Sequence, residues 1–306
     1  MPKPPTALVA SLPRGGMTSW RSYVELVKPR VIALMMFTVV VGMLLSQAGW
    51  PHWTVLAFGT LGIGLVAAGA AAANHVIDQR IDALMARTRG RPLPRGVLGT
   101  AQAIVFAATL VTSGLALLLW ASNLLCTALT LASLLGYAVV YSLVLKKRTP
   151  QNIVIGGAAG AAPPLLGWVA VTGQVDAGAL VLFLIILIWT PPHFWALAIH
   201  RRDDYARAGI PMLPVVRGVS YTTARILYYS IALGGVSLLP VAIGLSGPVY
   251  LVGALALGAR FIAFAWRLRR DSALAMPTFR YSIVYLFALF ALLLADHWLA
   301  ASGWPS

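Results

Sequence analysis

Long apolar stretches alternate with short polar segments along the chain from about residue 31 onward. A helix needs about 20 mostly apolar residues to cross a bilayer, and nine runs of roughly this length can be recognised. Their approximate bounds are 31–47, 53–76, 99–120, 123–145, 151–172, 178–199, 219–245, 248–266 and 281–300. The pattern therefore predicts an all-α polytopic membrane protein, a bundle of about nine transmembrane helices.

The first 20 residues contain no such run and carry prolines, glycines and serines, so we expect a disordered or peripheral segment. The first long apolar run begins beyond Arg30, and no small-residue cleavage site follows it, which argues against a signal peptide. The remaining residues, 21–306, are predicted to form one membrane domain.

Composition supports this class of protein. Hydrophobic residues make up 59% of the 306 residues and charged residues only 10%, whereas soluble domains carry about a quarter charged residues. The single cysteine, Cys126, excludes an intramolecular disulfide framework. The net charge of +15 is compatible with nucleic-acid binding in principle. The basic residues fall in short loops between apolar runs, however, which is typical of a membrane topology signal and not of a soluble basic face.

Lys and Arg occur in every second connection. They precede the first run, follow the second, fourth and sixth, and join the eighth to the ninth. The segments that contain none are 48–52, 121–123, 173–177 and 246–247. Because Lys and Arg are retained in cytoplasmic loops, we predict a cytoplasmic N-terminus and an outside C-terminus. The N-terminal segment is neither clearly Arg/Ser-rich nor amphipathic, which favours a bacterial inner membrane over an organelle.

Arg260 lies well inside the eighth run, about two turns from its basic end. Its side chain can reach the interface by snorkelling along apolar surface. The alternative is a buried partner inside the bundle.

Two groups of carboxylates follow the second and sixth runs. Asn74, Asp78 and Asp82 are spaced i, i+4, i+8, which places them on one face of a helix. Two carboxylates one turn apart repel each other, so this arrangement calls for a compensating cation. Mg²⁺ fits, because it takes oxygen ligands and is commonly shared with substrate phosphates. Asp203 and Asp204 form the second group.

Basic side chains accompany both groups on the same predicted face, among them Arg87, Arg91 and Lys146. Carboxylates, a divalent metal and Arg or Lys donors together make a cradle for a diphosphate. Apolar helices below it offer room for a hydrocarbon tail, for example along the small residues 62–73. The spacing therefore indicates an enzyme or carrier for a lipid diphosphate, with interfacial Asp–Arg ion pairs as the plainer alternative.

These residues also carry a resemblance. Asn74, Asp78 and Asp82 match Asn-x3-Asp-x3-Asp, the first motif of the intramembrane aromatic prenyltransferase (UbiA-type) superfamily. Further matching segments are 26–31, 87–94, 149–157, 162–164, 192–195 and 208–214. From about residue 20 onward the chain resembles the heme-farnesylating branch of that superfamily. Many superfamily members carry Asp-x3-Asp as the second motif, whereas here His200 takes its first position and Asp204 its second.

The resemblance implies transfer of the farnesyl group of farnesyl diphosphate to the 2-vinyl group of heme b (protoheme IX). Water adds as well, and the products are heme O and diphosphate. It implies Mg²⁺ as the cofactor and the lipid bilayer as the setting, with a downstream heme A synthase or oxidase assembly as a further partner and no nucleic acid. The implied metal ligands are Asn74, Asp78, Asp82 and Asp204, of which the three aspartates are the catalytic residues. The implied diphosphate ligands are Asn74, Arg87, Arg91 and Lys146.

Two histidines are candidates for binding heme. His193 follows two prolines inside the sixth run, where it can ligate or orient iron, or serve as a hydrogen-bonded core histidine. His200 adjoins the second carboxylate group and is placed to contact a phosphate or a heme propionate. Aromatic rings can shield a carbocation or simply pack. The candidates are Tyr137, Tyr141, Trp189 and Trp195.

Two other functions remain open on the sequence. One is a related intramembrane prenyltransferase with a different aromatic acceptor, against which the single aspartate of the second motif and the His193 segment argue. The other is an ion-coupled transporter, whose carboxylates would more often lie near the middle of the membrane than at one interface.

Overall fold

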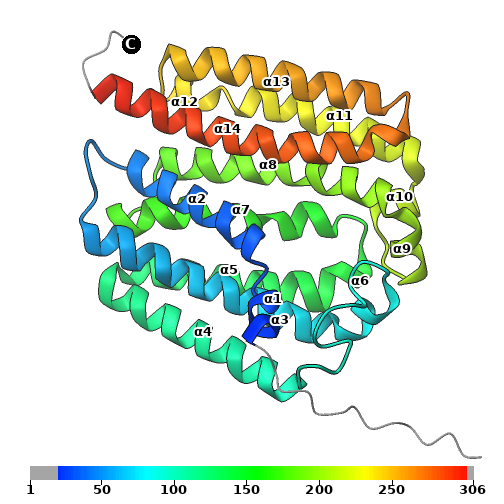
Figure 1. The fold of residues 1–306 in the computed structure, drawn as a ribbon. Coiled ribbons are helices and arrows are strands. Elements are labelled where there is room, and N and C mark those ends of the chain that lie inside the picture. The colour runs from blue at the N-terminus through cyan, green and yellow to red at the C-terminus, as the bar shows by residue number, and fades with distance from the viewer. Residues whose placement is uncertain (1–19, 302–306) are drawn as a thin grey trace, which may run out of the picture.

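The structure, a computed structural model, describes residues 20–301, and within this range it is helical with no β-strand (Figure 1). The helices are α1 (Trp20–Leu26), α2 (Pro29–Leu45), α3 (Thr60–Leu84), α4 (Thr100–Ala121), α5 (Leu124–Leu135), α6 (Lys146–Arg148), α7 (Asn152–Thr172), α8 (Ala177–His200), α9 (Arg202–Arg207), α10 (Leu213–Val216), α11 (Gly218–Val236), α12 (Leu239–Ala242), α13 (Pro248–Leu268) and α14 (Ala275–Ala301). The π-helical segments η1 (Val55–Gly59) and η2 (Gly136–Leu145) adjoin α3 and α5, and the short 3₁₀ helix η3 (Ser272–Leu274) precedes α14. The segment predicted to be disordered lies outside the described residues, except for Trp20.

Eight of the described helical stretches are long and apolar enough to cross a membrane, and the bent pair α1–α2 makes a ninth. The predicted bundle of about nine spans is therefore confirmed. The main difference lies in the second span, which was expected to end at residue 76 but continues as one helix to Leu84. Asn74, Asp78 and Asp82 thus lie within an unbroken helix.

The long helices run side by side, and the short helices α6, α9 and α10 gather at one end of the bundle (Figure 1). The loop that follows α3 lies at that same end. Trp50 and Trp120 are exposed at the opposite end, where the ring of Trp50 packs 5.1 Å from that of Trp298. Exposed tryptophans of this kind are typical of the boundary between apolar chains and headgroups.

Two carboxylates at this opposite end serve as helix caps. Asp176 accepts a hydrogen bond from the N–H of Ala179 at the start of α8 and another from the Trp168 indole at 3.0 Å. Asp296 of α14 is buried and accepts the N–H of Tyr250 at 3.1 Å, near the start of α13. Negative charge is favourable at a helix N-terminus, so both side chains have structural roles.

Arg260 is exposed on α13, with its guanidinium 5.1 Å from the centre of the Tyr281 ring. The exposed Arg260 thus packs against the ring of Tyr281, a residue that is itself buried. The described structure gives it no buried carboxylate.

Helices α2 and α7 approach each other so closely that only glycine fits at two positions. A Cβ added to Gly42 would lie 2.1 Å from the carbonyl oxygen of Pro164, and one added to Gly167 would lie 2.1 Å from that of Val39. Small residues permit such backbone contacts between membrane helices. Within the small-residue stretch 62–73, Gly62 makes a similar approach to α4, so close helix packing occurs there as expected.

We expect Gly42→Ala and Gly167→Ala each to lower the free energy of unfolding by about 1–3 kcal/mol, because the added methyl group forces α2 and α7 apart. Gly160→Ala on α7 is the matched control, since a Cβ there meets nothing within 4 Å. Thermal unfolding of the three variants in one detergent measures the difference. Equal stability of all three would contradict the proposed backbone contact.

Candidate functional site

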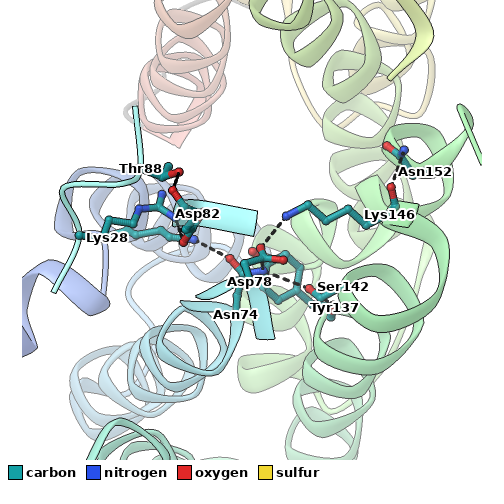
Figure 2. A network of polar contacts seen from close by, with 10 residues as sticks. Lys28, Asn74, Asp78, Asp82, Thr88, Tyr137, Ser142, Lys146 and Asn152 are labelled. Atoms are coloured by element: carbon teal, nitrogen blue, oxygen red, sulfur yellow. Dashed lines mark hydrogen bonds and ion pairs between the residues drawn. The ribbon is translucent and has the colours of Figure 1, made fainter. Parts of the chain in front are cut away.

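The predicted polar face of α3 is present and is buried. Asn74, Asp78 and Asp82 are only 5%, 2% and 4% exposed, and they point into a polar network at the end of the bundle that carries the short helices (Figure 2). Polar groups buried at such depth must find partners within the protein or in a ligand. The partners come from segments far apart in the sequence.

Asn74 connects three of these segments. Its amide nitrogen donates to Asp78 Oδ2 at 2.8 Å and to the hydroxyl of Ser142 at 3.2 Å. Its amide oxygen accepts a hydrogen bond from Lys28 Nζ at 2.9 Å. Lys28 lies in the break between α1 and α2 and has a positive φ of 53°, a conformation that is uncommon for a residue other than glycine. The break therefore aims the Lys28 side chain at α3.

Both carboxylates of α3 are paired with basic side chains. Lys146 Nζ lies 2.5 Å from Asp78 Oδ2, and Arg91 Nη1 lies 2.6 Å from Asp82 Oδ2. Lys146 and Arg91 are mostly buried, with 13% and 15% of their side chains exposed. With Lys28, three basic side chains surround two carboxylates. This excess of basic groups in a site of low dielectric favours the binding of an anion.

The chain around Lys146 is shaped to reach α3. The preceding segment η2 is π-helical, a rare geometry that often occurs at functional sites. Its Ser142 faces Asn74 and also donates to the carbonyl of Tyr137 at 2.9 Å. After Lys146, the fully buried Asn152 donates to the carbonyl of Thr149 at 2.7 Å and closes the turn into α7. Figure 2 shows Ser142 and the Lys146 side chain reaching Asn74 and Asp78, with Asn152 beside the Lys146 backbone.

The loop after α3 folds back over the helix end. The Thr88 hydroxyl donates to the backbone carbonyl of Asp82 at 2.9 Å, which brings Arg91 onto the Asp82 carboxylate. Arg87, also predicted to bind diphosphate, is exposed. Neither an ion pair nor a hydrogen bond is found for Arg87 among residues 20–300.

Asp204 in α9 carries the second predicted carboxylate. It is buried and forms ion pairs with Arg207 and, at 3.7 Å, with Arg201. Asp203 beside it is exposed. The two carboxylate groups are thus each neutralised by their own basic residues.

Tyr205 lies beside Asp204 in α9 and is buried. Burial raises the pKa of its phenol, while the positive charges of Arg87 and Arg201 act in the opposite direction. Arg87 follows α3, so a basic residue of the loop after α3 contributes to the electrostatics of Tyr205. His200, the candidate next to this group, is exposed at the end of α8.

The carboxylates of α3 offer oxygen ligands of the kind that a magnesium ion takes. Asp78 Oδ1 is buried and has no hydrogen-bond partner in the described structure, so one hard oxygen is left uncommitted. Within residues 20–300, however, no three Asp, Glu, His or Cys side chains lie close enough to hold one ion together. The residues fit a site in which Asp78 and Asp82 contribute oxygens and other ligands come from substrate and water. The predicted set that also includes Asp204 stays a prediction.

The aromatic and histidine candidates lie deeper in the bundle. The rings of Tyr137 and Tyr141 stack at 5.7 Å beside the Asp78 network, and Trp195 is buried within α8. His193 lies in α8 with its Nδ1 at 2.6 Å from the hydroxyl of Ser282 on α14.

Lys28, Ser142 and Asn152 take part in the site but were not predicted as site residues. Lys28 and Asn152 fall within two segments that carry the resemblance, 26–31 and 149–157, so a signal for them was present. Ser142 is a lone small polar residue in an apolar run, which occurs often in membrane helices and carries no such signal.

Comparison with known proteins agrees with this geometry. The model of the UbiA prenyltransferase family matches residues 35–294. The chain is 60% identical over 281 residues to a protein named protoheme IX farnesyltransferase from Marinobacter nauticus, an alignment that covers 91% of this chain and 93% of the relative. A protein of the same name from Azotobacter vinelandii is 61% identical over 289 residues, which cover 94% and 96% of the two chains.

Solved structures share the fold at low sequence identity. A digeranylgeranylglyceryl phosphate synthase superposes with a TM-score of 0.76 at 20% identity, covering 91% of this chain and 98% of that one. A UbiA homologue from Archaeoglobus fulgidus bound to GPP and Mg²⁺ superposes with a TM-score of 0.62 at 14% identity, covering 89% and 99%. The bundle architecture is therefore one already seen in solved proteins.

We expect Lys146→Met to lower the free energy of unfolding by about 3–5 kcal/mol, because it leaves Asp78 buried without its cation. Adding Asp78→Leu should recover much of this loss, since the buried charge is then removed as well. Lys147→Met is the matched control, because Lys147 is exposed. Thermal unfolding of the single and double variants measures the interaction between Lys146 and Asp78. Additive losses in the free energy of unfolding would show that the two side chains do not stabilise each other.

Proposed function

Because the chain belongs to the UbiA prenyltransferase family, we propose that it transfers the farnesyl group of farnesyl diphosphate to the 2-vinyl group of heme b, with addition of water, to give heme O. The observation that carries the proposal is the buried face of Asn74, Asp78 and Asp82, surrounded by basic side chains, in a chain of which relatives named protoheme IX farnesyltransferase share about 60% of the residues. A buried site with excess basic groups suits a diphosphate, and the apolar helices suit its hydrocarbon tail.

A bound Mg²⁺ supplies positive charge that polarises the diphosphate and assists its departure. Asp78 and Asp82 are the residues that would hold it, with Asn74 as a neutral oxygen donor and Asp204 as a ligand from the second group. The free Oδ1 of Asp78 supports this assignment. So does the presence of Mg²⁺ and a prenyl diphosphate in the Archaeoglobus homologue.

Lys146 and Arg91 have two roles in this proposal. Through their ion pairs they neutralise Asp78 and Asp82, which keeps the carboxylates from repelling each other. When the substrate binds, the same ammonium and guanidinium groups donate hydrogen bonds to the diphosphate oxygens. Lys28 and Arg87 complete the basic lining. Donors held in place where negative charge develops are usually the largest catalytic term.

The bond changes follow from the substrates. The bond between the farnesyl C1 and the diphosphate oxygen breaks, and its electrons leave with the diphosphate. The electrons of the heme vinyl group form the new carbon–carbon bond with the allylic cation, water oxygen adds to the resulting cationic carbon, and a proton is released. The stacked rings of Tyr137 and Tyr141 would exclude water from the allylic cation in this proposal.

We place the site on the cytoplasmic side of a bacterial inner membrane. The connections at the end of the bundle that holds the site carry the Lys and Arg residues, and those at the opposite end carry none. This is the distribution expected when the site end remains in the cytoplasm. The N-terminus would then be cytoplasmic and the C-terminus outside.

Product analysis tests the proposal directly. In a host that lacks its own heme O synthase, heme extracts should contain a hydroxyethylfarnesyl heme when this chain is expressed and none with an empty vector or with Asp78→Ala. In isolated membranes, a chelator of divalent cations should stop the reaction, and added Mg²⁺ should restore it. If the inserted chain made no farnesylated heme although farnesyl diphosphate was present, heme b would be excluded as the acceptor.

A matched pair of variants tests the second carboxylate. We expect Asp204→Asn to lower kcat at least a hundredfold, because it removes a buried charge from the proposed metal and diphosphate site. Asp203→Asn should keep most of the activity, since Asp203 is exposed. Steady-state farnesyl transfer in membranes with equal amounts of inserted protein gives the comparison. Full activity in Asp204→Asn would show that Asp204 of α9 takes no part in the reaction.

A further inference from the structure

His193 is clamped inside the bundle by three neighbours. Its ring stacks on the ring of Trp189 at 4.2 Å with an angle of 19° between the planes. On its other flank it stacks on Phe279 of α14 at 4.5 Å and 28°. Its Nδ1 lies 2.6 Å from the hydroxyl oxygen of Ser282. The two stacks fix the plane of the imidazole, and the hydrogen bond fixes its rotation within that plane.

The hydrogen bonds of Ser282 also determine which nitrogen of His193 carries the proton. The Ser282 hydroxyl donates its hydrogen to the carbonyl of Phe279 at 2.6 Å. Its oxygen must therefore accept from Nδ1–H of His193, which leaves Nε2 as an unprotonated nitrogen with a free lone pair. Among the residues that the structure describes, none forms a hydrogen bond with Nε2, and the side chain is half-buried.

This arrangement is that of a metal-ligating histidine. Such histidines almost always donate their other ring nitrogen to a fixed oxygen, which sets the tautomer and the orientation of the ring. Ser282 is fully buried, and its backbone carbonyl accepts the indole N–H of Trp189 at 2.8 Å. Trp189 and Phe279, which stack on the imidazole, thus both form a hydrogen bond with Ser282. A packing histidine would not need an unpaired Nε2 in an apolar span.

The position of His193 suits a large flat acceptor. His193 lies seven residues before the end of α8, and Ser282 lies seven residues after the start of α14. Both are thus two turns, or about 10 Å, from the end of the bundle that carries the diphosphate site. A porphyrin whose metal lies at this depth has its ring among apolar side chains, and its carboxylates can extend toward the basic end.

We propose that Nε2 of His193 is an axial ligand to the iron of the heme acceptor and that Ser282 is the positioning residue that holds the required tautomer. This inference rests on the proposed function, because it states how the acceptor is bound. The neutral imidazole donates its lone pair, so ligation releases no proton. The site therefore selects a metalloporphyrin over the metal-free ring.

Titration of the purified full-length chain in lipid nanodiscs with ferric heme b tests the ligation. We expect the wild-type protein to give the absorption spectrum of a histidine-ligated heme. His193→Ala should lose this spectrum and bind ferric heme at least tenfold more weakly, and added imidazole should restore the spectrum. His52→Ala is the matched control, because His52 is exposed at the opposite end of the bundle. It should behave as the wild type does.

Metal-free protoporphyrin IX separates ligation from packing. Since it has no iron, the wild type and His193→Ala should bind it equally. Ser282→Ala should weaken ferric heme binding about 10- to 100-fold and alter the spectrum, as is found for supporting residues of metal ligands. Ser282→Thr, which keeps the hydroxyl group, should restore the spectrum.

Three results would overturn the inference. These are a wild-type protein without a histidine-ligated spectrum, a His193→Ala variant that keeps it, and an equal loss of ferric heme and metal-free porphyrin in that variant. Farnesyl transfer measured in the same preparations separates this inference from the proposed function. Transfer without a histidine-dependent spectrum would exclude the ligation alone, and the spectrum without transfer would exclude the proposed reaction alone.

Discussion

The ion pairs of Asp78 with Lys146 and of Asp82 with Arg91 connect α3 to the loop that follows it and to the segment before α7, together with the hydrogen bonds of Thr88 and Ser142. A carboxylate buried in an apolar bundle needs a cation or several hydrogen-bond donors beside it, and cations take this place at Asp78 and Asp82. The loop after α3 and the turn before α7 must therefore fold onto α3. The same cations are the donors that a diphosphate requires. The stability of this end of the bundle and its affinity for the substrate thus depend on the same few side chains.

Because the same basic groups serve both purposes, the carboxylates of the site pair with basic side chains of the site itself. Lys28, Lys146 and Arg91 supply more basic groups than the two carboxylates of α3 can neutralise. The imbalance is tolerable only near the end of the bundle. An arriving diphosphate and its metal ion change the charge of the site in opposite senses. Both can therefore be admitted without leaving a large uncompensated charge.

Much of the fold and part of the site were predictable from the sequence, because membrane helices obey simple rules. The apolar runs located the spans, and the i, i+4, i+8 spacing placed Asn74, Asp78 and Asp82 on one buried face. The family resemblance, confirmed by the comparisons, pointed to Arg91 and Lys146. The spacing could not show that these two residues pair with the carboxylates, because that depends on the path of the two loops. It also could not distinguish Asp176 and Asp296 as helix caps, since capping depends on neighbouring helices.

Backbone geometry was the least predictable part. The left-handed conformation of Lys28 and the π-helical segment η2 have no local signature in the sequence. The π-helical geometry of η2 has a consequence for changes in chain length. Each residue of a π-helix turns the chain by less than the roughly 100° of an α-helix, so ordinary α-helix over 136–145 would keep Lys146 directed at Asp78 only if the segment were shorter. The number of residues in this apolar segment, and not only their identity, is therefore under functional constraint.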